Sequence, residues 1–114
     1  MLEITLRFVP ESLNEILAMH YRKRANYTKE LKEAVYYECL AQKLNPITKF
    51  PVHVYITIHS KNKHKKDCDN YTAKAIIDGL VLAKVIPDDN TDYIKPLTVD
   101  IEYSGEDKTV IILK

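Results

Sequence analysis

The segment VHVYITIHSKNKHKKDCDNYTAKAIIDGLVLAK, residues 52–84, changes its hydrophobic period halfway along. Between residues 52 and 59 apolar and polar side chains alternate, which predicts a strand with one apolar and one polar face. Beyond Asn70 apolar residues recur every three or four positions, which predicts an amphipathic helix ending near Lys84. The stretch therefore predicts a strand, a polar linker and a helix in succession. The apolar stripe of the helix consists of Ala73, Ile76, Ile77, Leu80, Val81 and the stem of Lys84.

The sequence before this segment predicts a strand, a loop and a second helix. Residues 2–8 alternate and indicate a strand. Residues 10–27 are polar and cationic, which predicts a long, mobile loop. Thr28 is a suitable N-cap for a helix that ends near Leu44, just before a proline.

Two more strands are expected near the end of the chain. Residues 97–103 and 109–113 alternate, and the turn residues between them predict an antiparallel hairpin. We therefore expect one α+β domain over residues 1–114, in the order β-α-β-α-β-β. Its sheet should be mixed, with the helices packed on it.

Acidic residues gather in the linker and in the loop after the helix. Residues 67–92 hold six of the sixteen acidic residues of the chain. If the extended strand continues through the linker, Asp67 and Asp69 point to the same side. At about 100° per residue, Lys74 lies at the border of the helical apolar stripe and Asp78 just beyond it. A strand, a helix and a loop therefore bring carboxylates and a lysine towards one place.

This combination suits a divalent metal ion. Magnesium takes oxygen ligands and is often held by one or two carboxylates together with substrate phosphate. One ion or a pair would polarise a phosphodiester and activate water. A lysine beside the acids would stabilise negative charge in the transition state. The pattern therefore predicts a magnesium-dependent nuclease site, with manganese as a substitute.

Each part of the pattern also has a purely structural interpretation. Asp69 or Asn70 would serve as the helix N-cap, and residues 87–90 are good turn formers. Lys74 alone is most simply a solvated helix residue, and Asp78 alone favours a solvating role. An EF-hand is excluded, because Tyr71 and Thr72 stand where it needs Asp or Asn and then Gly. Only the combination indicates a metal site.

The combination resembles the pattern of the RusA family of Holliday-junction resolvases. The matching residues are Lys65-Lys66-Asp67-Cys68-Asp69-Asn70, Lys74, Asp78-Gly79-Leu80 and Ile86-Pro87-Asp88-Asp89, with Pro10-Glu11-Ser12-Leu13-Asn14 after the first strand. The resemblance implies that Asp67, Asp69 and Asp89 bind the metal and that Lys74 is needed for cleavage. Family members often carry a third acid after the Asp-Asp pair. This chain has Asn90 there and Asp92 two residues on, which leaves the ligand from the loop open.

The resemblance also implies a function and an assembly. The expected activity is magnesium-dependent, structure-selective endonuclease cleavage of branched DNA, resolving four-way junctions in recombination and repair. Asn70, Asp78 and Asp88 are expected beside the metal ligands. A homodimer would supply one site for each of the two nicks. Two other classes stay open: a catalytically silent branched-DNA-binding protein, and an interaction protein whose acids are merely solvated.

The distribution of charge, rather than the net charge of +1, favours nucleic-acid binding. Tyr21 and Tyr27 flank the first basic cluster, where tyrosines either stack on bases or pack on the surface. The expected DNA-binding residues are Arg22, Lys23 and Arg24 in that cluster, and Lys61, Lys63, Lys65 and Lys66 in a second cluster beside the acids.

The remaining features place the chain in the cytoplasm. No apolar run reaches membrane-spanning length, and no signal peptide precedes the first strand. Cys39 and Cys68 are therefore expected to be small buried or half-buried hydrophobes rather than a disulfide. His53 and His59 lie six residues apart, a spacing that does not suit zinc.

Overall fold

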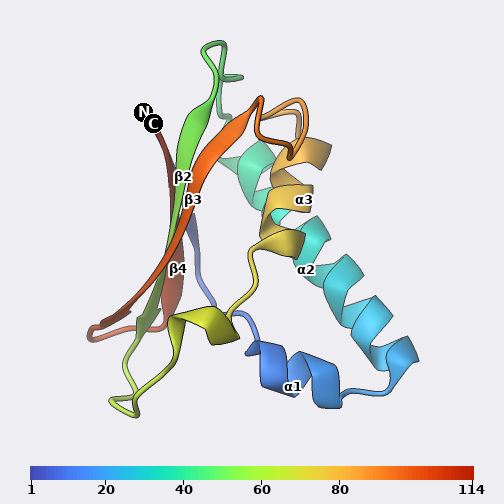
Figure 1. The fold of residues 1–114 in the computed structure, drawn as a ribbon, viewed down its shortest axis with the longest axis vertical. Coiled ribbons are helices and arrows are strands. Elements are labelled where there is room, and N and C mark those ends of the chain that lie inside the picture. The colour runs from blue at the N-terminus through green and yellow to red at the C-terminus, as the bar shows by residue number, and fades with distance from the viewer.

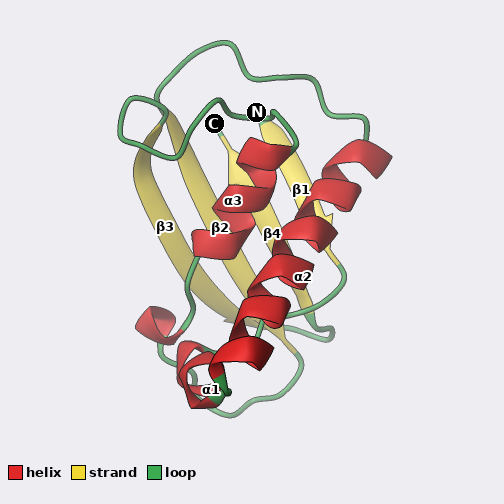
Figure 2. Cartoon of the chain, turned by 90° about the vertical axis from the view of Figure 1, so that its right-hand side faces the viewer, coloured by secondary structure: helices red, strands yellow, loops and turns green.

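The computed structural model describes residues 1–114 except for the Cys68 side chain. In this part of the chain, four strands form one mixed sheet. Helices cover one face of this sheet (Figures 1 and 2). The elements are β1 (Leu2–Leu6), α1 (Leu13–Ala18), α2 (Tyr21–Ala41), β2 (Val52–Ser60), the 3-10 turn η1 (Cys68–Asn70), α3 (Lys74–Leu82), β3 (Ile94–Tyr103) and β4 (Lys108–Leu113).

The sheet has the strand order β1-β4-β2-β3, which confirms the α+β class. β2 and β3 are parallel and are joined by a crossover that contains η1 and α3, whereas β4 is antiparallel to both β1 and β2. The predicted hairpin of the last two strands is wrong, because β4 leaves β3 and inserts between β1 and β2. There Ile111 pairs with Ile4 on one side and with Ile56 on the other, so β4 is buried centrally.

The region predicted as a mobile loop is helical. α1 occupies part of it, and Ser12 caps this helix: its Oγ accepts from the Glu15 N–H at 3.2 Å and donates to Glu15 Oε1 at 2.9 Å. The Ser12 hydroxyl therefore satisfies one N–H of the first turn, as an N-cap side chain does, and also holds the Glu15 carboxylate. α2 then begins at Tyr21, seven residues before the predicted cap Thr28. Because α2 buries no residue before Leu31, its first turns carry no apolar stripe that the sequence pattern could reveal.

The start of α3 also differs from the prediction. Neither Asp69 nor Asn70 is the N-cap, because both lie in η1 and the helix begins at Lys74. Ala73 precedes the first turn and makes no side-chain capping hydrogen bond. The helix ends at Leu82, so Lys84 lies beyond it, exposed, with a φ of 61°.

The hydrophobic core lies between the sheet and the two longer helices. β2 contributes Val54, Ile56 and Ile58, which belong to one buried cluster with residues of α2 and α3. The stripe predicted for α3 is confirmed at its main positions, Ile76, Ile77 and Leu80. Cys39 of α2 is buried as predicted, and burial raises the pKa of its thiol to about 11. The prediction that Cys68 is buried or half-buried concerns a side chain that lies outside the described part of the structure.

None of the helices in the described part of the chain has both the length and the apolar character needed to cross a membrane.

α2 and α3 pack so closely that one contact position admits only glycine. A β-carbon on Gly79 would lie 2.6 Å from Val35 Cβ and 2.8 Å from the Lys32 carbonyl oxygen. Overpacking typically costs about 1–3 kcal/mol, against a gain of about 1 kcal/mol in helix propensity on replacing glycine by alanine.

Both approaches are under 3.0 Å and one is to a backbone atom, which puts the overpacking cost at the upper end of this range. We therefore expect Gly79→Ala to lower the free energy of unfolding by about 2 kcal/mol, measured by urea denaturation. Gly105→Ala is the matched control, because a β-carbon there would meet no atom within 4 Å. Equal stabilities of the two variants would contradict this description of the α2–α3 contact.

Candidate functional site

A basic loop, residues 61–66, follows the end of β2 and leads into an acidic turn, residues 67–70. Backbone hydrogen bonds hold both ends of this loop in place. The Lys61 N–H donates to Asp107 Oδ1 at 2.9 Å, and the Lys66 N–H donates to the Tyr103 hydroxyl at 2.9 Å. Tyr103 lies at the end of β3, paired with the last residue of β2. The sheet therefore fixes where the basic loop ends and the acidic turn begins.

The acidic turn is held from its other side by α1. Asn70 Oδ1 accepts a hydrogen bond from the backbone N–H of Asn14 at 3.0 Å, and the Asn70 N–H donates to the Asp67 carbonyl at 3.0 Å. Asn70 is therefore a bridge between η1 and the first turn of α1. Figures 1 and 2 both place α1 and the acidic turn at the same end of the molecule.

A lysine and two carboxylates meet beside α3. Lys74 Nζ lies 3.2 Å from Asp78 Oδ1, one turn along the helix, and 3.3 Å from Asp89 Oδ2 in the loop that follows. Asp88 Oδ1 in turn accepts from the Asp89 N–H at 2.8 Å, and Asp88 Oδ2 accepts from Asn90 Nδ2 at 3.4 Å. The structure thus brings Lys74, Asp78 and Asp89 together, with Asp88 hydrogen-bonded to the Asp89 backbone.

The contacts within this cluster stabilise the charged forms of Lys74 and Asp89. The hydrogen bond to Asp78, followed by that to Asp89, raises the pKa of Lys74. The hydrogen bond from Lys74, followed by the interaction with Asp88, lowers the pKa of Asp89. Lys74 is 68% exposed, so these ion pairs are screened by water and contribute little to stability. The ammonium group is both charged and accessible to a ligand.

Asp67 and Asp69 are not gathered with this cluster. The alternation that predicted them on one side does not apply, because β2 ends at Ser60 and the acidic turn contains η1. Both are exposed. Among the described side chains, no three of the His, Cys, Asp and Glu residues lie close enough to hold one metal ion.

The chemical type of the donor atoms nevertheless suits magnesium. Carboxylate oxygens of Asp67, Asp69 and Asp89 are the hard ligands that this ion prefers. All three carboxylates are exposed, Asp67 and Asp69 in the acidic turn and Asp89 in the loop after α3.

The predicted DNA-binding residues fall into two groups. Lys61, Lys63 and Lys65 are exposed and Lys66 is half-buried, all beside the acidic turn. Arg22 and Lys23 are exposed on the first turn of α2.

Arg24 differs from its neighbours. Its Nη2 donates to the carbonyls of Leu17, at 3.2 Å, and Met19, at 3.3 Å. It therefore ties α2 to the end of α1, and its contact with DNA stays a prediction.

Sequence patterns did not single out Tyr103 or Asn14 as site residues. Asn14 stands in the motif that follows the first strand, so the resemblance contained a signal for it. The sequence contained no signal for Tyr103, because its contact with Lys66 depends on β3 lying parallel to and beside β2.

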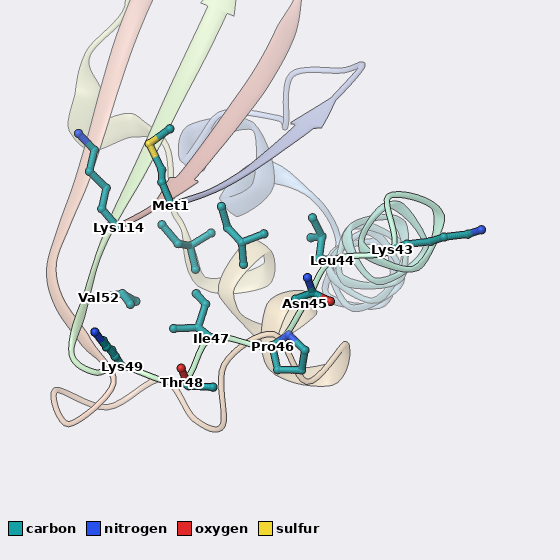
Figure 3. Close-up of a pocket in the computed structure, with 12 residues that line it drawn as sticks. Met1, Lys43, Leu44, Asn45, Pro46, Ile47, Thr48, Lys49, Val52 and Lys114 are labelled. Atoms are coloured by element: carbon teal, nitrogen blue, oxygen red, sulfur yellow. The ribbon is translucent and has the colours of Figure 1, made fainter.

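A pocket of about 570 Å³ lies at the opposite end of β2, between the start of β1, the end of β4 and residues 43–49 (Figure 3). In Figure 3 the Lys43 side chain points away from it. Lys114 Nζ lies 5.2 Å from the centre of the Tyr55 ring. The predicted site residues do not line this pocket.

No protein-family model matches the chain, and no curated protein matches it.

Proposed function

We propose that the protein is a magnesium-dependent, structure-selective endodeoxyribonuclease that resolves four-way DNA junctions in the cytoplasm. The observation that carries this proposal is the contact of Lys74 with Asp89 at 3.3 Å, across fifteen residues of sequence. It brings together the lysine and one of the three acids that the resemblance implies for the cleavage site. The exposed lysines beside the acidic turn supply the cation density that DNA phosphates require.

The metal ligands in this proposal are Asp67, Asp69 and Asp89. When bound there, magnesium supplies Lewis acidity towards a phosphodiester and an activated water. Lys74 remains protonated beside the acids and stabilises charge on the phosphate. Asn70 and Tyr103 position the acidic turn through their hydrogen bonds to α1 and to the basic loop.

We further propose a homodimer. Symmetrical resolution needs two nicks, and one chain of 114 residues offers one such acidic site. A two-fold axis would present identical sites to two strands of the junction. The exposed basic clusters of both protomers would then contact the four DNA arms.

A second candidate is a catalytically silent protein that binds branched DNA. It is favoured by one observation: among the described side chains, no group of three His, Cys, Asp or Glu residues is assembled that could hold a metal ion. Such a protein would use the same basic surface and would need no metal.

Cleavage and binding should be measured on a labelled four-way junction and on a linear duplex of the same sequence. We expect cleavage of the junction in magnesium or manganese, none in EDTA, and little cleavage of the duplex. Tight junction binding with no cleavage in either metal would favour the silent binding protein. No preference for the junction over the duplex would contradict both candidates.

A further inference from the structure

An aromatic and cationic tip, His20, Tyr21 and Arg22, forms the corner between α1 and α2. In Figure 1 this corner lies far from the sheet, beyond the covered core. Tyr21 is 64% exposed, although tyrosine buries a large apolar ring when a core is available. The apolar ring therefore faces water at a protruding position.

Neighbouring contacts hold the Tyr21 ring in place without burying it. The His20 and Tyr21 ring centroids lie 4.4 Å apart at an angle of 35°. Arg22 Nε donates to the Tyr21 hydroxyl at 3.3 Å, and Arg22 Cζ lies 5.7 Å from the ring centroid. His20 Nδ1 also accepts from the Arg22 N–H at 3.3 Å, as the N-cap of α2. The tip is thus ordered before any partner binds.

The other tyrosine that flanks the basic cluster behaves differently. Tyr27 is half-buried, and its hydroxyl accepts from the Glu11 N–H at 2.7 Å. Burial, as the largest cause, raises its pKa. Tyr27 is therefore a packing residue, and of the two tyrosines only Tyr21 offers an accessible ring.

The base of the tip is connected to the candidate site. Arg24 joins the start of α2 to the end of α1 through the Leu17 and Met19 carbonyls. The first turn of α1 is in turn hydrogen-bonded to Asn70 in the acidic turn. The tip therefore has a defined position relative to the acidic turn, and both lie at the same end of the molecule (Figure 1).

We propose that the tip stacks on an unpaired or unstacked base at the branch point of a DNA junction, with Tyr21 as the stacking residue. An aromatic ring beside exposed cations, Arg22 and Lys23, complements a base flanked by phosphates. Duplex DNA offers no free base face, whereas a branch point does. The tip would therefore favour branched DNA over duplex DNA. This inference rests on the proposed function, because it names the feature of the same substrate that the protein recognises.

The test compares Tyr21→Ala with the wild-type protein in EDTA, where the junction stays intact. We expect Tyr21→Ala to weaken junction binding about tenfold and duplex binding less than twofold, as the loss of one stacked base predicts. Tyr21→Phe should retain wild-type affinity, since stacking needs the ring and not the hydroxyl. With 2-aminopurine at the branch point, the bound wild type and Tyr21→Phe should quench emission more than Tyr21→Ala does.

Tyr37→Ala is the matched control, because Tyr37 is 63% exposed on the same helix but lies away from the tip. It should leave junction affinity and emission unchanged. A wild-type protein that prefers the junction, together with a Tyr21→Ala variant that keeps the full preference, would overturn the inference and leave the proposed function standing. A wild-type protein with no junction preference would instead overturn both.

Discussion

Asp69→Asn is expected to reduce junction cleavage in magnesium by about a thousandfold or more, the effect of losing several kcal/mol of charge stabilisation. The substitution removes one anionic oxygen ligand from the proposed metal site. Junction binding should persist or become tighter, because repulsion between the acidic turn and the phosphates falls. Asp69 is exposed in η1, so the fold should be unaffected.

Single-turnover cleavage and junction affinity should be measured for this variant beside Asp100→Asn. Asp100 is an exposed aspartate of β3 that lies outside the acidic turn and the Lys74 cluster. Its replacement should leave both quantities unchanged. Full cleavage by Asp69→Asn would remove Asp69 from the site.

Lys74→Ala should lower the single-turnover cleavage rate about 100-fold or more, and junction affinity much less. Its ammonium group is exposed and held between Asp78 and Asp89, where it can meet a phosphate at the reacting position. Because the two ion pairs are screened by water, the urea midpoint of unfolding should stay almost unchanged.

The comparison variant replaces Lys65 and Lys66 together by alanine. These residues belong to the basic loop, so their loss should mainly weaken binding and flatten its salt dependence by roughly one unit of slope per lost phosphate contact. A Lys74→Ala variant that loses affinity but cleaves at the wild-type rate once bound would contradict the catalytic role of this lysine.

Local patterns predicted the parts of the fold that bury one regular face. β2 alternates strictly along its length, and α3 carries a dense apolar stripe, so both followed from the sequence. The first half of α2 did not, since it projects beyond the core and has no buried face. Its formation depends on contacts such as that of Arg24 with α1, which no periodicity reveals.

The sheet order and the acidic turn depend on long-range pairing. Turn residues between β3 and β4 favour a hairpin locally, but β4 gains two neighbours by inserting between β1 and β2. The positions of Asp67 and Asp69 likewise depend on Tyr103 and Asn14, residues distant in sequence. By contrast, the contact of Lys74 with Asp78 follows from helical spacing alone.

The most direct test of the central claim is the fate of a four-way junction incubated with the wild-type protein in magnesium, with each strand labelled in turn. We predict nicks at symmetric positions in two opposing strands, giving two duplexes whose nicks can be sealed by DNA ligase. An intact junction under conditions of full binding, or cuts scattered over all four strands and the linear duplex, would contradict the account.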